Sequence, residues 1–571
     1  MTFENFIMKI ADKKKISAEI RRNFVTSCLE EVLQYLIEEP GTLHSCILVN
    51  RNWCRLAIPI LWSDPFNNLK RKQPNNSNLS IRTFISCLED SEKSLLMNEF
   101  LKIPESWKNT IFDYPKYLQI FKYDHFGKVL ESFVKMNYKS LIETKPDFNK
   151  IYMIITSVIM DMIFKKSRRL RTLQYIHDHI SSQRTIYTLD ILLYSFNNNT
   201  LSEIGGGRKI SHYIPLIKLT KLKFFGYCIH EESYTVIWPK FFNKLAKLAK
   251  NIQELFIHLP SSDKIDFDLR KVYPAIANLI NSQRNLKSIE INESHCSKMD
   301  QEIINSLIWT QSNSLTNFKI NGRIRFSNLI QLLENCKNLK SIQMYKLSKY
   351  GKVIPKDIII SSLEKFCHWN PHLQFQYQTN NADYEITLTL KMISKSLKKF
   401  ACSYICDNIS NTINEYCINL SHLCLFITFE TFEKVSKLLP SINTLSYLYL
   451  ESPKVDIILF KSNMLQLLAS SLPNSLTHLS LNLFIPMEFF KIFLINCNVK
   501  LSVLELYNIQ DATYKLSLYI NDYYNRNDQL KLLKLDNILY SKFNGFLYHI
   551  HKKKGGYKVV ESFNPIWFDE K

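Results

Sequence analysis

Apolar residues near the start of the chain recur at helical spacing. Leu29, Val32, Leu33 and Leu36 fall at positions i, i+3, i+4 and i+7, which is one stripe of an amphipathic helix. The sequence Glu38-Glu39-Pro40-Gly41 follows and interrupts the pattern, because Pro and Gly do not continue a helix easily. A first amphipathic helix that ends before Pro40 is therefore predicted.

The next stretch, residues 42–66, reads TLHSCILVNRNWCRLAIPILWSDPF and holds a dense group of apolar side chains. Thr42 is expected to cap a second helix. Pro59 is expected to break or kink a third one before Leu61 and Trp62. The segment is thus predicted to complete a compact three-helix unit. A unit this short and apolar has to bury its surface on the rest of the chain or on a partner.

From about residue 165 onward, the pattern apolar-x-x-apolar-x-apolar recurs. The copies are Leu170-Leu173-Tyr175, Leu219-Leu222-Phe224, Ile252-Leu255-Ile257, Leu286-Ile289-Ile291, Leu315-Phe318-Ile320, Leu339-Ile342-Met344, Leu397-Phe400-Cys402, Leu420-Leu423-Leu425, Leu445-Leu448-Leu450, Leu476-Leu479-Leu481, Leu501-Leu504-Leu506 and Leu530-Leu533-Leu535. A divergent copy is placed at Leu373-Phe375-Tyr377. Neighbouring copies start, for example, 24 residues apart at Leu315 and Leu339 and 25 apart at Leu420 and Leu445.

This pattern directs alternate side chains of a short strand into an interior. One such unit cannot bury its apolar face alone, so units stack and share a continuous core. Helix-like stretches such as FSNLIQLLENCKN and NMLQLLASSLPN separate the copies. Pattern and spacing are typical of leucine-rich repeats with insertions. The predicted fold class is α/β, an irregular solenoid with parallel strands on the concave face and helices on the convex face.

The chain is therefore divided into five parts. They are an N-terminal segment (1–22), the three-helix unit (23–66), a linker and helical region (67–164), the repeats (165–550) and a C-terminal tail (551–571). The polar stretch NNLKRKQPNNSN at 67–78 separates the three-helix unit from the first repeat. This separation argues against a unit that merely caps the open end of the array.

Composition narrows the function classes. Hydrophobic residues make up 46% of the 571 residues, enough for a large core, and the formal net charge is +21. Such a charge attracts acidic proteins, nucleic acid or anionic membranes. The lysines are scattered, however, and a solvated surface is the simplest interpretation. A nuclear-import signal at 165–171 is the alternative.

The N-terminus shows no apolar leader, and the longest apolar run, from Tyr152 to Phe164, is too short to span a bilayer. We expect a cytoplasmic or nuclear protein with reduced thiols and no membrane partner.

No motif predicts catalysis. Gly205-Gly206-Gly207-Arg208 lacks the Lys-Ser/Thr of a phosphate-binding loop, and the chain has neither HExxH nor a nucleophile elbow. The densest thiol group is Cys402, Cys406, Cys417 and Cys424 with His422. Several of these cysteines occupy apolar positions of the repeats, which favours small buried hydrophobes over zinc ligands. We therefore expect no catalytic residue, no metal and no cofactor, and hence no enzyme.

The three-helix unit resembles an F-box. The resemblance is carried by Leu29-x-x-Val32-Leu33-x-x-Leu36, by Leu43-x-x-Cys46-x-x-Val49-Asn50-Arg51-x-Trp53-Cys54-x-Leu56-Ala57, and by Leu61-Trp62. The stretch is similar to F-box proteins of the large expanded families of fungi, which commonly carry C-terminal leucine-rich repeats. Most F-boxes open with Leu-Pro, where this chain has Phe24-Val25.

The resemblance implies the substrate-recognition subunit of an SCF-type (cullin–RING) ubiquitin ligase. Its F-box binds a Skp-type adaptor, and through it cullin, while the repeats hold an unknown target protein. The adaptor-binding positions carried over are Phe24, Val25, Leu29, Leu33, Val49, Trp53 and Leu61. The candidates for substrate binding, at variable positions of the repeats, are Lys287, Glu290, His478, Ser480 and Glu505.

Two other interpretations stay open. One is a leucine-rich-repeat scaffold or binding protein without ligase coupling. The other is a nucleic-acid binder, which rests on the net charge alone and is not our expectation.

Overall fold

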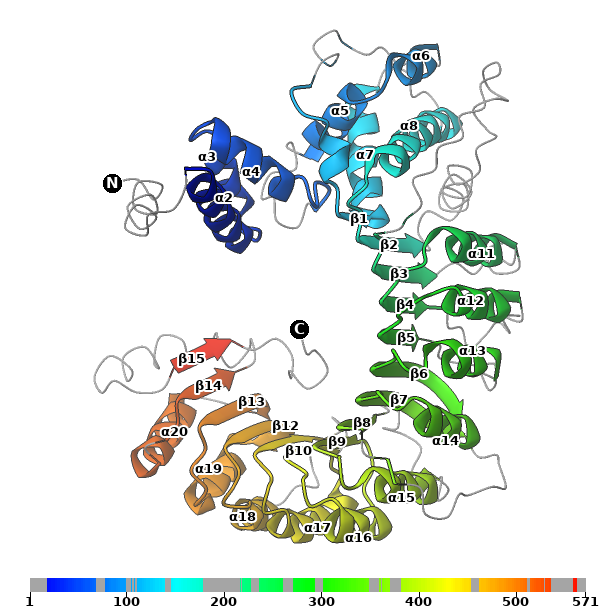
Figure 1. The fold of residues 1–571 in the computed structure, drawn as a ribbon. Coiled ribbons are helices and arrows are strands. Elements are labelled where there is room, and N and C mark those ends of the chain that lie inside the picture. Colours follow the sequence, from blue (N-terminus) through cyan, green and yellow to red (C-terminus); the bar gives the residue numbers. More distant parts are fainter. Residues whose placement is uncertain are drawn as a thin grey trace. The chain divides into compact units, whose positions relative to one another are not determined.

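The computed structural model describes residues 18–67, 77–98, 104, 107, 110–138, 145–177, 216, 218–226, 236–259, 271–292, 301–348, 359–360, 362–369, 382–452, 462–510, 514–527, 529–535 and 558–561. The chain divides into two compact units, Met1–Lys287 and Ser288–Lys571. Each unit is described by itself (Figure 1).

Unit 1 begins with the three predicted helices. They are α2 (Ala18–Tyr35), α3 (Pro40–Ile47) and α4 (Arg51–Leu61). The second helix starts at Pro40, with Glu39 as its N-cap, and not at Thr42 as predicted. Proline fits the first helical position because the N–H that it lacks would have no partner there.

The third helix passes through Pro59, where a break or kink before Leu61 was predicted. It runs to Leu61 as one helix. The Trp62 N–H still donates to the Ile58 carbonyl at 3.0 Å, so the helical hydrogen bonds resume directly after the proline. The loss of one N–H at Pro59 therefore does not end the helix.

Most of the region 79–164 is helical, as predicted. Its elements are α5 (Ser77–Ser86), α6 (Asp90–Asn98), η4 (Tyr114–Tyr117), α7 (Tyr123–Asn137) and α8 (Lys145–Lys166). Within the described residues, every helix is too short or too polar to cross a membrane.

The parallel sheet starts earlier than predicted. Strand β1 (Ile120–Lys122) lies before the expected start at residue 165 and pairs in parallel with β2 (Thr172–His177). Its residues Leu118, Phe121 and Tyr123 have the spacing of the repeat pattern, and all three are buried. This copy was not predicted, because residues 67–164 were assigned to a linker and a helical region.

The rest of unit 1 continues the same construction. Strands β3 (Lys221–Gly226) and β4 (Glu254–His258) add in parallel to β2, while helices α11 (Trp238–Leu248) and α12 (Val272–Asn281) follow them in the chain. Leu173, Leu222 and Leu255 stand opposite one another in register, so one apolar row passes through three strands.

Unit 2 repeats the pattern, with each strand paired in parallel to the next one in the chain. Its strands are β5 (Ser288–Asn292), β6 (Asn317–Arg325), β7 (Ser341–Ser348), β8 (Lys365–His368), β9 (Lys399–Cys402), β10 (His422–Phe426), β11 (Tyr447–Glu451), β12 (His478–Pro486), β13 (Val503–Gln510), β14 (Leu532–Leu535) and β15 (Lys558–Glu561).

Helices lie between these strands in the chain. They are α13 (Gln301–Gln311), α14 (Phe326–Asn335), α15 (Ala382–Ile393), α16 (Asp407–Tyr416), α17 (Phe429–Leu438), η10 (Leu439–Ser441), α18 (Ser462–Ser471), α19 (Met487–Asn496) and α20 (Tyr514–Arg526). Figure 1 shows them along one face of the strands. The α/β class and the parallel leucine-rich-repeat architecture are confirmed.

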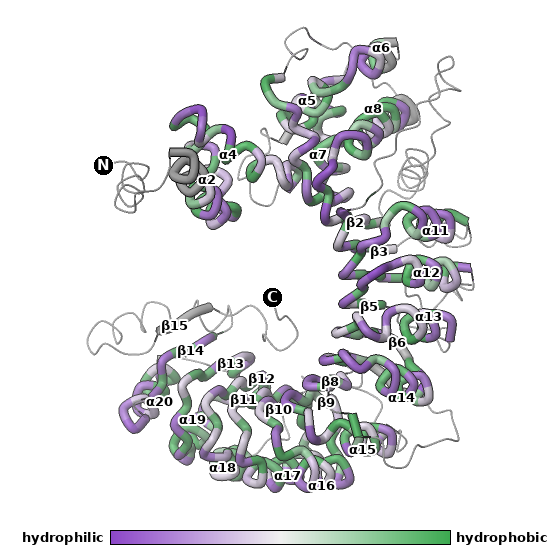
Figure 2. Tube along the Cα trace, in the orientation of Figure 1, coloured by the Kyte–Doolittle hydropathy of each residue, from purple (hydrophilic) through white to green (hydrophobic). Residues whose placement is uncertain are grey.

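The predicted apolar triplets form the core. All of the copies from Leu170 to Leu535 are buried. Buried and less buried residues alternate along β3 and β5, whereas β8–β11 each bury three neighbouring residues. Figure 2 shows hydrophobic and hydrophilic residues mixed along the strands and the helices. The divergent copy at Leu373-Phe375-Tyr377 lies outside the described residues. The strand near it is β8, whose triplet is Leu363, Phe366 and His368.

His368 thus occupies a position that is apolar in the other copies. It is buried, and its two ring nitrogens have no hydrogen-bond partner among the described residues. Burial lowers the pKa of His368 to about 4. The neutral imidazole is therefore the form that the fold accepts.

The substitution His368→Leu is expected to stabilise unit 2 by about 1–2 kcal/mol at pH 5, and by less above pH 7. Because the folded pKa lies below the ordinary value of 6.5, stability is lost as the pH falls from 6.5 towards 4. Leucine removes that loss and fills the apolar position. Urea denaturation midpoints at the two pH values measure the effect, and a variant that is less stable than the original chain at pH 5 would contradict it.

Candidate protein-binding surfaces

The three-helix unit has a closed core of its own. Leu33, Leu43, Cys46, Ala57 and Ile60 form a buried cluster, against which Trp53 and Leu61 pack while partly buried. Leu29 is buried beside Trp53. Four of the seven predicted adaptor-binding residues, Leu29, Leu33, Trp53 and Leu61, thus lock the helices together. The side chains of Phe24 and Val25 lie outside the described residues.

Asn50 fixes the start of α4. Its side-chain Oδ1 accepts hydrogen bonds from the backbone N–H groups of Asn52 and Trp53, both at 2.9 Å. Such an N-cap satisfies two of the backbone donors that a helix leaves unpaired at its start. The two residues before the cap, Leu48 and Val49, are left exposed in the turn after α3.

A second set of apolar side chains on this unit faces outward. Leu29 and Leu33 of α2 are buried, and Leu36, directly after the helix, packs partly buried against the same core. Val32, which was predicted to lie on the same stripe, is exposed instead, and so is Tyr35. Val32, Tyr35, Leu48 and Val49 are together called the outer apolar set. Tyr35 is 80% exposed, Leu48 76% and Val49 59%.

Sequence reasoning named only Val49 of the outer apolar set as a site residue. Tyr35 and Leu48 were missed, although Tyr35 lies three residues after Val32 on the same stripe. Exposed apolar side chains on a unit whose own core is closed are candidates for contact with a partner protein. The set is therefore our candidate for a partner-binding surface.

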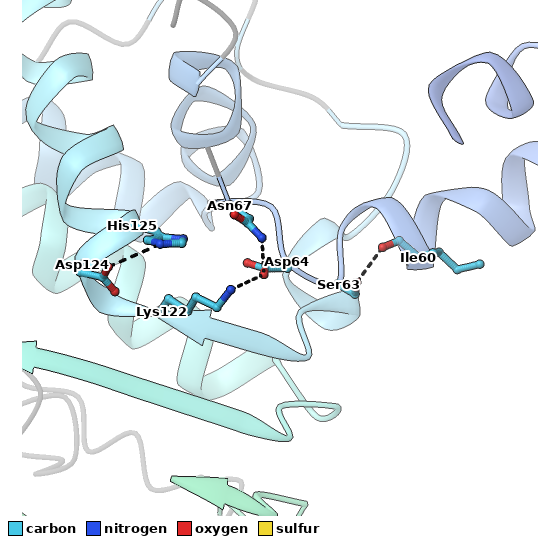
Figure 3. Close-up of polar contacts among 7 residues, drawn as sticks. All are labelled: Ile60, Ser63, Asp64, Asn67, Lys122, Asp124 and His125. Carbon is cyan, nitrogen blue, oxygen red and sulfur yellow. Dashed lines mark hydrogen bonds and ion pairs between the residues drawn. The ribbon is translucent and has the colours of Figure 1, made fainter. Parts of the chain in front are cut away.

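The three-helix unit joins the first strand through backbone hydrogen bonds. The Ser63 carbonyl accepts from the N–H groups of Gln119 and Ile120 at 3.0 and 2.9 Å. Close by, Lys122 Nζ lies 3.1 Å from Asp64 Oδ2, and Asn67 Nδ2 donates to the same oxygen at 3.3 Å (Figure 3). The end of α4 is therefore tied to strand β1.

Another pair of the junction lies just after β1. His125 Nε2 is 3.5 Å from Asp124 Oδ2 (Figure 3). Burial lowers the pKa of His125, and the nearby Asp124 carboxylate only partly opposes it.

Aromatic packing strengthens the same junction. The Phe66 side chain is fully buried, and its ring centroid lies 5.1 Å from the ring centroids of both Phe84 and Phe126. The ring centroids of Trp62 and Tyr114 are 4.3 Å apart. Each such pair contributes about 0.5–1.5 kcal/mol beyond the area that it buries. The unit and the start of the sheet thus share one core, so the predicted separation of the unit from the first repeat is wrong. Residues 68–76 of the predicted linker lie outside the described residues.

The predicted substrate-binding residues fall into two groups. Lys287 is exposed, Glu290 pairs with Lys319 across β5 and β6 at 2.9 Å, and His478 is half-buried. Ser480 and Glu505, by contrast, are fully buried. Their side chains are therefore not available at the surface of the free chain.

Glu505 is the centre of a polar cluster on β12–β14. Lys534 Nζ donates to its Oε1 at 2.5 Å, and His478 Nε2 lies 3.1 Å from the same oxygen. Burial alone would raise the pKa of Glu505, but His478 and Lys534 outweigh it and hold this pKa at about 2. The carboxylate is therefore charged, and it orients the side chains on either side.

The cysteines of the densest thiol group occupy interior positions. Cys402, Cys406, Cys417 and Cys424 are all buried. Burial raises the pKa of Cys402 and of Cys417 to about 12, so these thiols stay protonated. Within the described ranges, no three potential ligands of these types lie close enough to hold a metal ion.

Comparison with known proteins adds only a general likeness. No family model and no curated protein matches the sequence. Among solved structures, the leucine-rich repeat-containing protein LegL7 from Legionella pneumophila is similar over 54% of this chain and 91% of its own, with 13% identity and a TM-score of 0.36.

The yeast Rad7 and Elc1 complex gives a similar result. The match covers 72% of this chain and 92% of the other, with 16% identity and a TM-score of 0.31. These scores are too low to carry an argument. The fold is shown by the parallel strands and buried triplets of the chain itself.

Proposed function

We propose that this chain is the substrate-recognition subunit of an SCF-type cullin–RING ubiquitin ligase. Its F-box-like unit would bind a Skp-type adaptor, and through it cullin, while the repeats hold a target protein. The observation that carries the proposal is the outer apolar set on a unit whose own core is already closed. Apolar groups that the fold of the unit does not need are best explained by a partner.

Under this proposal the chain itself makes or breaks no bond and is not an enzyme. It raises the effective concentration of the target near the ligase, so that ubiquitin transfer becomes quasi-intramolecular. The hydrogen bonds from Gln119 and Ile120 to the Ser63 carbonyl support this role, because they tie the adaptor-binding unit to the repeats without a loose tether.

The proposal is tested by capture of a purified Skp-type adaptor on the tagged full-length chain. We expect a stable one-to-one complex that survives gel filtration. A folded chain that captures no adaptor would overturn the proposal. In that case the alternative is favoured, a leucine-rich-repeat binding protein without ligase coupling.

A further inference from the structure

The fold divides the basic stretch 165–171 into two halves. In the first half, Lys165 pairs with Asp161 at 2.5 Å, and Lys166 Nζ donates to the carbonyl of Cys87 at 2.9 Å. Both lysines belong to the last turn of α8, where positive charge complements the helix dipole. The fold itself therefore uses these two side chains.

The second half consists of Arg168, Arg169 and Arg171, which we call the arginine turn. All three residues are exposed, although Ser167 and Leu170 beside them are buried. Within the described part of the chain, none of the three guanidinium groups has an ion pair or a hydrogen bond. Because the lysines already occupy the end of α8, the helix does not need the arginines. Their charge is available to a ligand.

The arginine turn begins a row of turns through which the chain enters the strands. Backbone hydrogen bonds join them in order, from Thr220 N–H to the Arg171 carbonyl at 2.9 Å, from Gln253 N–H to the Thr220 carbonyl at 2.7 Å, and from Lys287 N–H to the Gln253 carbonyl at 2.8 Å. Neighbouring strands lie about 4.8 Å apart, so the row is about 14 Å long. We call it the basic edge, and it consists of residues 167–171, 218–220, 249–253 and 282–287.

The basic edge contains Lys and Arg but no Asp or Glu. Besides the arginine turn, Lys218 and Arg284 are exposed, and among the described residues neither side chain has an ion pair. The carboxylate of Glu254, at the start of β4, is engaged by Lys221 of β3. Five exposed cations without an acidic partner therefore lie along this edge, and together they attract a ligand of opposite charge.

The composition of the basic edge favours an acidic protein segment as that ligand. Guanidinium groups are planar and bind carboxylates through two parallel hydrogen bonds. A single-stranded nucleic acid is held by aromatic stacking as well as by charge, and the four turns contain no Phe, Tyr or Trp. An extended protein chain rises about 3.3 Å per residue, so about four residues cover the edge.

The arginine turn also lies close to the three-helix unit. The Arg171 N–H donates to the Gln119 carbonyl at 2.8 Å, and the Gln119 N–H donates to the Ser63 carbonyl at 3.0 Å. Ser63 follows the end of α4 at Leu61. Two hydrogen-bonded steps, about 10 Å, thus separate the backbone of the arginine turn from the end of this unit. A segment bound here would lie beside the unit that binds the adaptor.

We propose that the basic edge binds an acidic segment of the target protein, and that the arginine turn makes the main contacts. The inference rests on the proposed function, because the segment belongs to the protein that the ligase modifies. Its carboxylates would pair with the three guanidinium groups. Lys218 and Arg284 would hold its farther end.

The test uses the full chain and a fluorescein-labelled peptide of eight glutamates, with fluorescence anisotropy at low and at moderate salt. The triple substitution Arg168→Gln, Arg169→Gln, Arg171→Gln is expected to weaken binding about thirtyfold, because three exposed charge pairs are lost. Salt should weaken binding to the unsubstituted chain. The melting temperature should stay nearly unchanged, since all three residues are exposed.

The matched control is the triple substitution Lys337→Gln, Lys340→Gln, Lys395→Gln, which removes the same charge from unit 2. These lysines also lie in turns before strands. They are exposed, and within the described ranges their side chains have no ion pair. Because the control spares the basic edge, it is expected to change the affinity for the peptide by less than about threefold.

Three results would overturn the inference. They are no binding of the peptide by the unsubstituted chain, equal losses in the two triple variants, and tighter binding of a short single-stranded RNA or DNA duplex that the arginine variant loses. Adaptor capture is measured on the same samples. Loss of peptide binding with intact capture in the arginine variant supports the basic edge, whereas a failure of the proposed function appears as absent capture in every sample.

Discussion

Replacing Leu48 and Val49 by glutamate is expected to reduce adaptor capture more than about a hundredfold while leaving the melting temperature nearly unchanged. Both side chains are exposed in the free chain, so the substitutions cost the fold little. In an apolar interface they would bury two charges without partners, which is strongly unfavourable. Isothermal titration with the purified adaptor, together with a thermal melt, measures both quantities.

The matched control is Trp309→Glu. Trp309 on α13 is 75% exposed, similar to Leu48, but belongs to unit 2. Its substitution is expected to leave adaptor affinity within about twofold. Unchanged capture by the Leu48→Glu, Val49→Glu chain would show that the outer apolar set is not the adaptor surface.

Substitution of Leu33 would give a less informative result. Leu33 is fully buried in the core of the three-helix unit, and Leu33→Ala is expected to cost about 2–5 kcal/mol. Capture would then be lost because the unit unfolds. Substitutions in the outer apolar set therefore test adaptor contact without a large loss of stability, whereas substitutions at core positions change both at once.

The second large effect is a loss of stability, expected when Glu505 is substituted. Its side chain is 1% exposed and contacts both Lys534 and His478. With the pKa of Glu505 held at about 2, the ionised carboxylate contributes about 3 kcal/mol at neutral pH. Glu505→Gln is expected to remove most of this, as measured by the urea denaturation midpoint at pH 7.

The pH dependence has a definite sign. Because the folded pKa lies below the ordinary value of 4.5, the stabilisation is fully present above pH 4.5 and is lost as the pH falls towards 2. The Glu505→Gln chain should lack this loss, so the two stability curves converge in acid. Curves that stay parallel down to pH 2 would contradict the assignment.

Glu254 provides the control for this second prediction. It pairs with Lys221 across β3 and β4, as Glu505 pairs with Lys534, but both partners are well exposed. Exposed pairs contribute about 0–1 kcal/mol. Glu254→Gln is therefore expected to change stability by less than about 1 kcal/mol, and an effect as large as that at Glu505 would show that burial is not the cause.

The strands could be predicted from the sequence because each needs three apolar residues at fixed spacing. Three strands of the sheet were not predicted. In β1, Tyr123 fills the third position in an aromatic surrounding, and in β8 a buried His368 takes an apolar place. The third, β15 (Lys558–Glu561), pairs with β14 but lies in the segment that was predicted to be a C-terminal tail. The position of a residue in the repeat pattern predicts whether its side chain faces the core. It does not predict whether the side chains packed around that position accept a polar group such as the His368 imidazole.

The exposure of side chains at the variable positions of the repeats could not be predicted in the same way. Ser480 and Glu505 occupy variable positions, yet both are fully buried. Ser480 stands in register with the large side chain of Tyr449 on β11, and Glu505 with Lys534 on β14. Whether a variable position reaches solvent thus depends on the size and charge of its neighbours on adjacent strands, which are distant in sequence.

The packing of Phe66 limits where the chain can be divided into fragments that still fold. A fragment that ends at residue 66, the predicted boundary of the three-helix unit, would keep three helices but remove Phe84 and Phe126, whose rings pack against Phe66. It would also leave the Ser63 carbonyl without the two backbone donors that it has in the whole chain. A fragment meant to carry the three-helix unit should therefore extend through α7, to Asn137, and shorter grafts onto other scaffolds are expected to be insoluble or poorly folded.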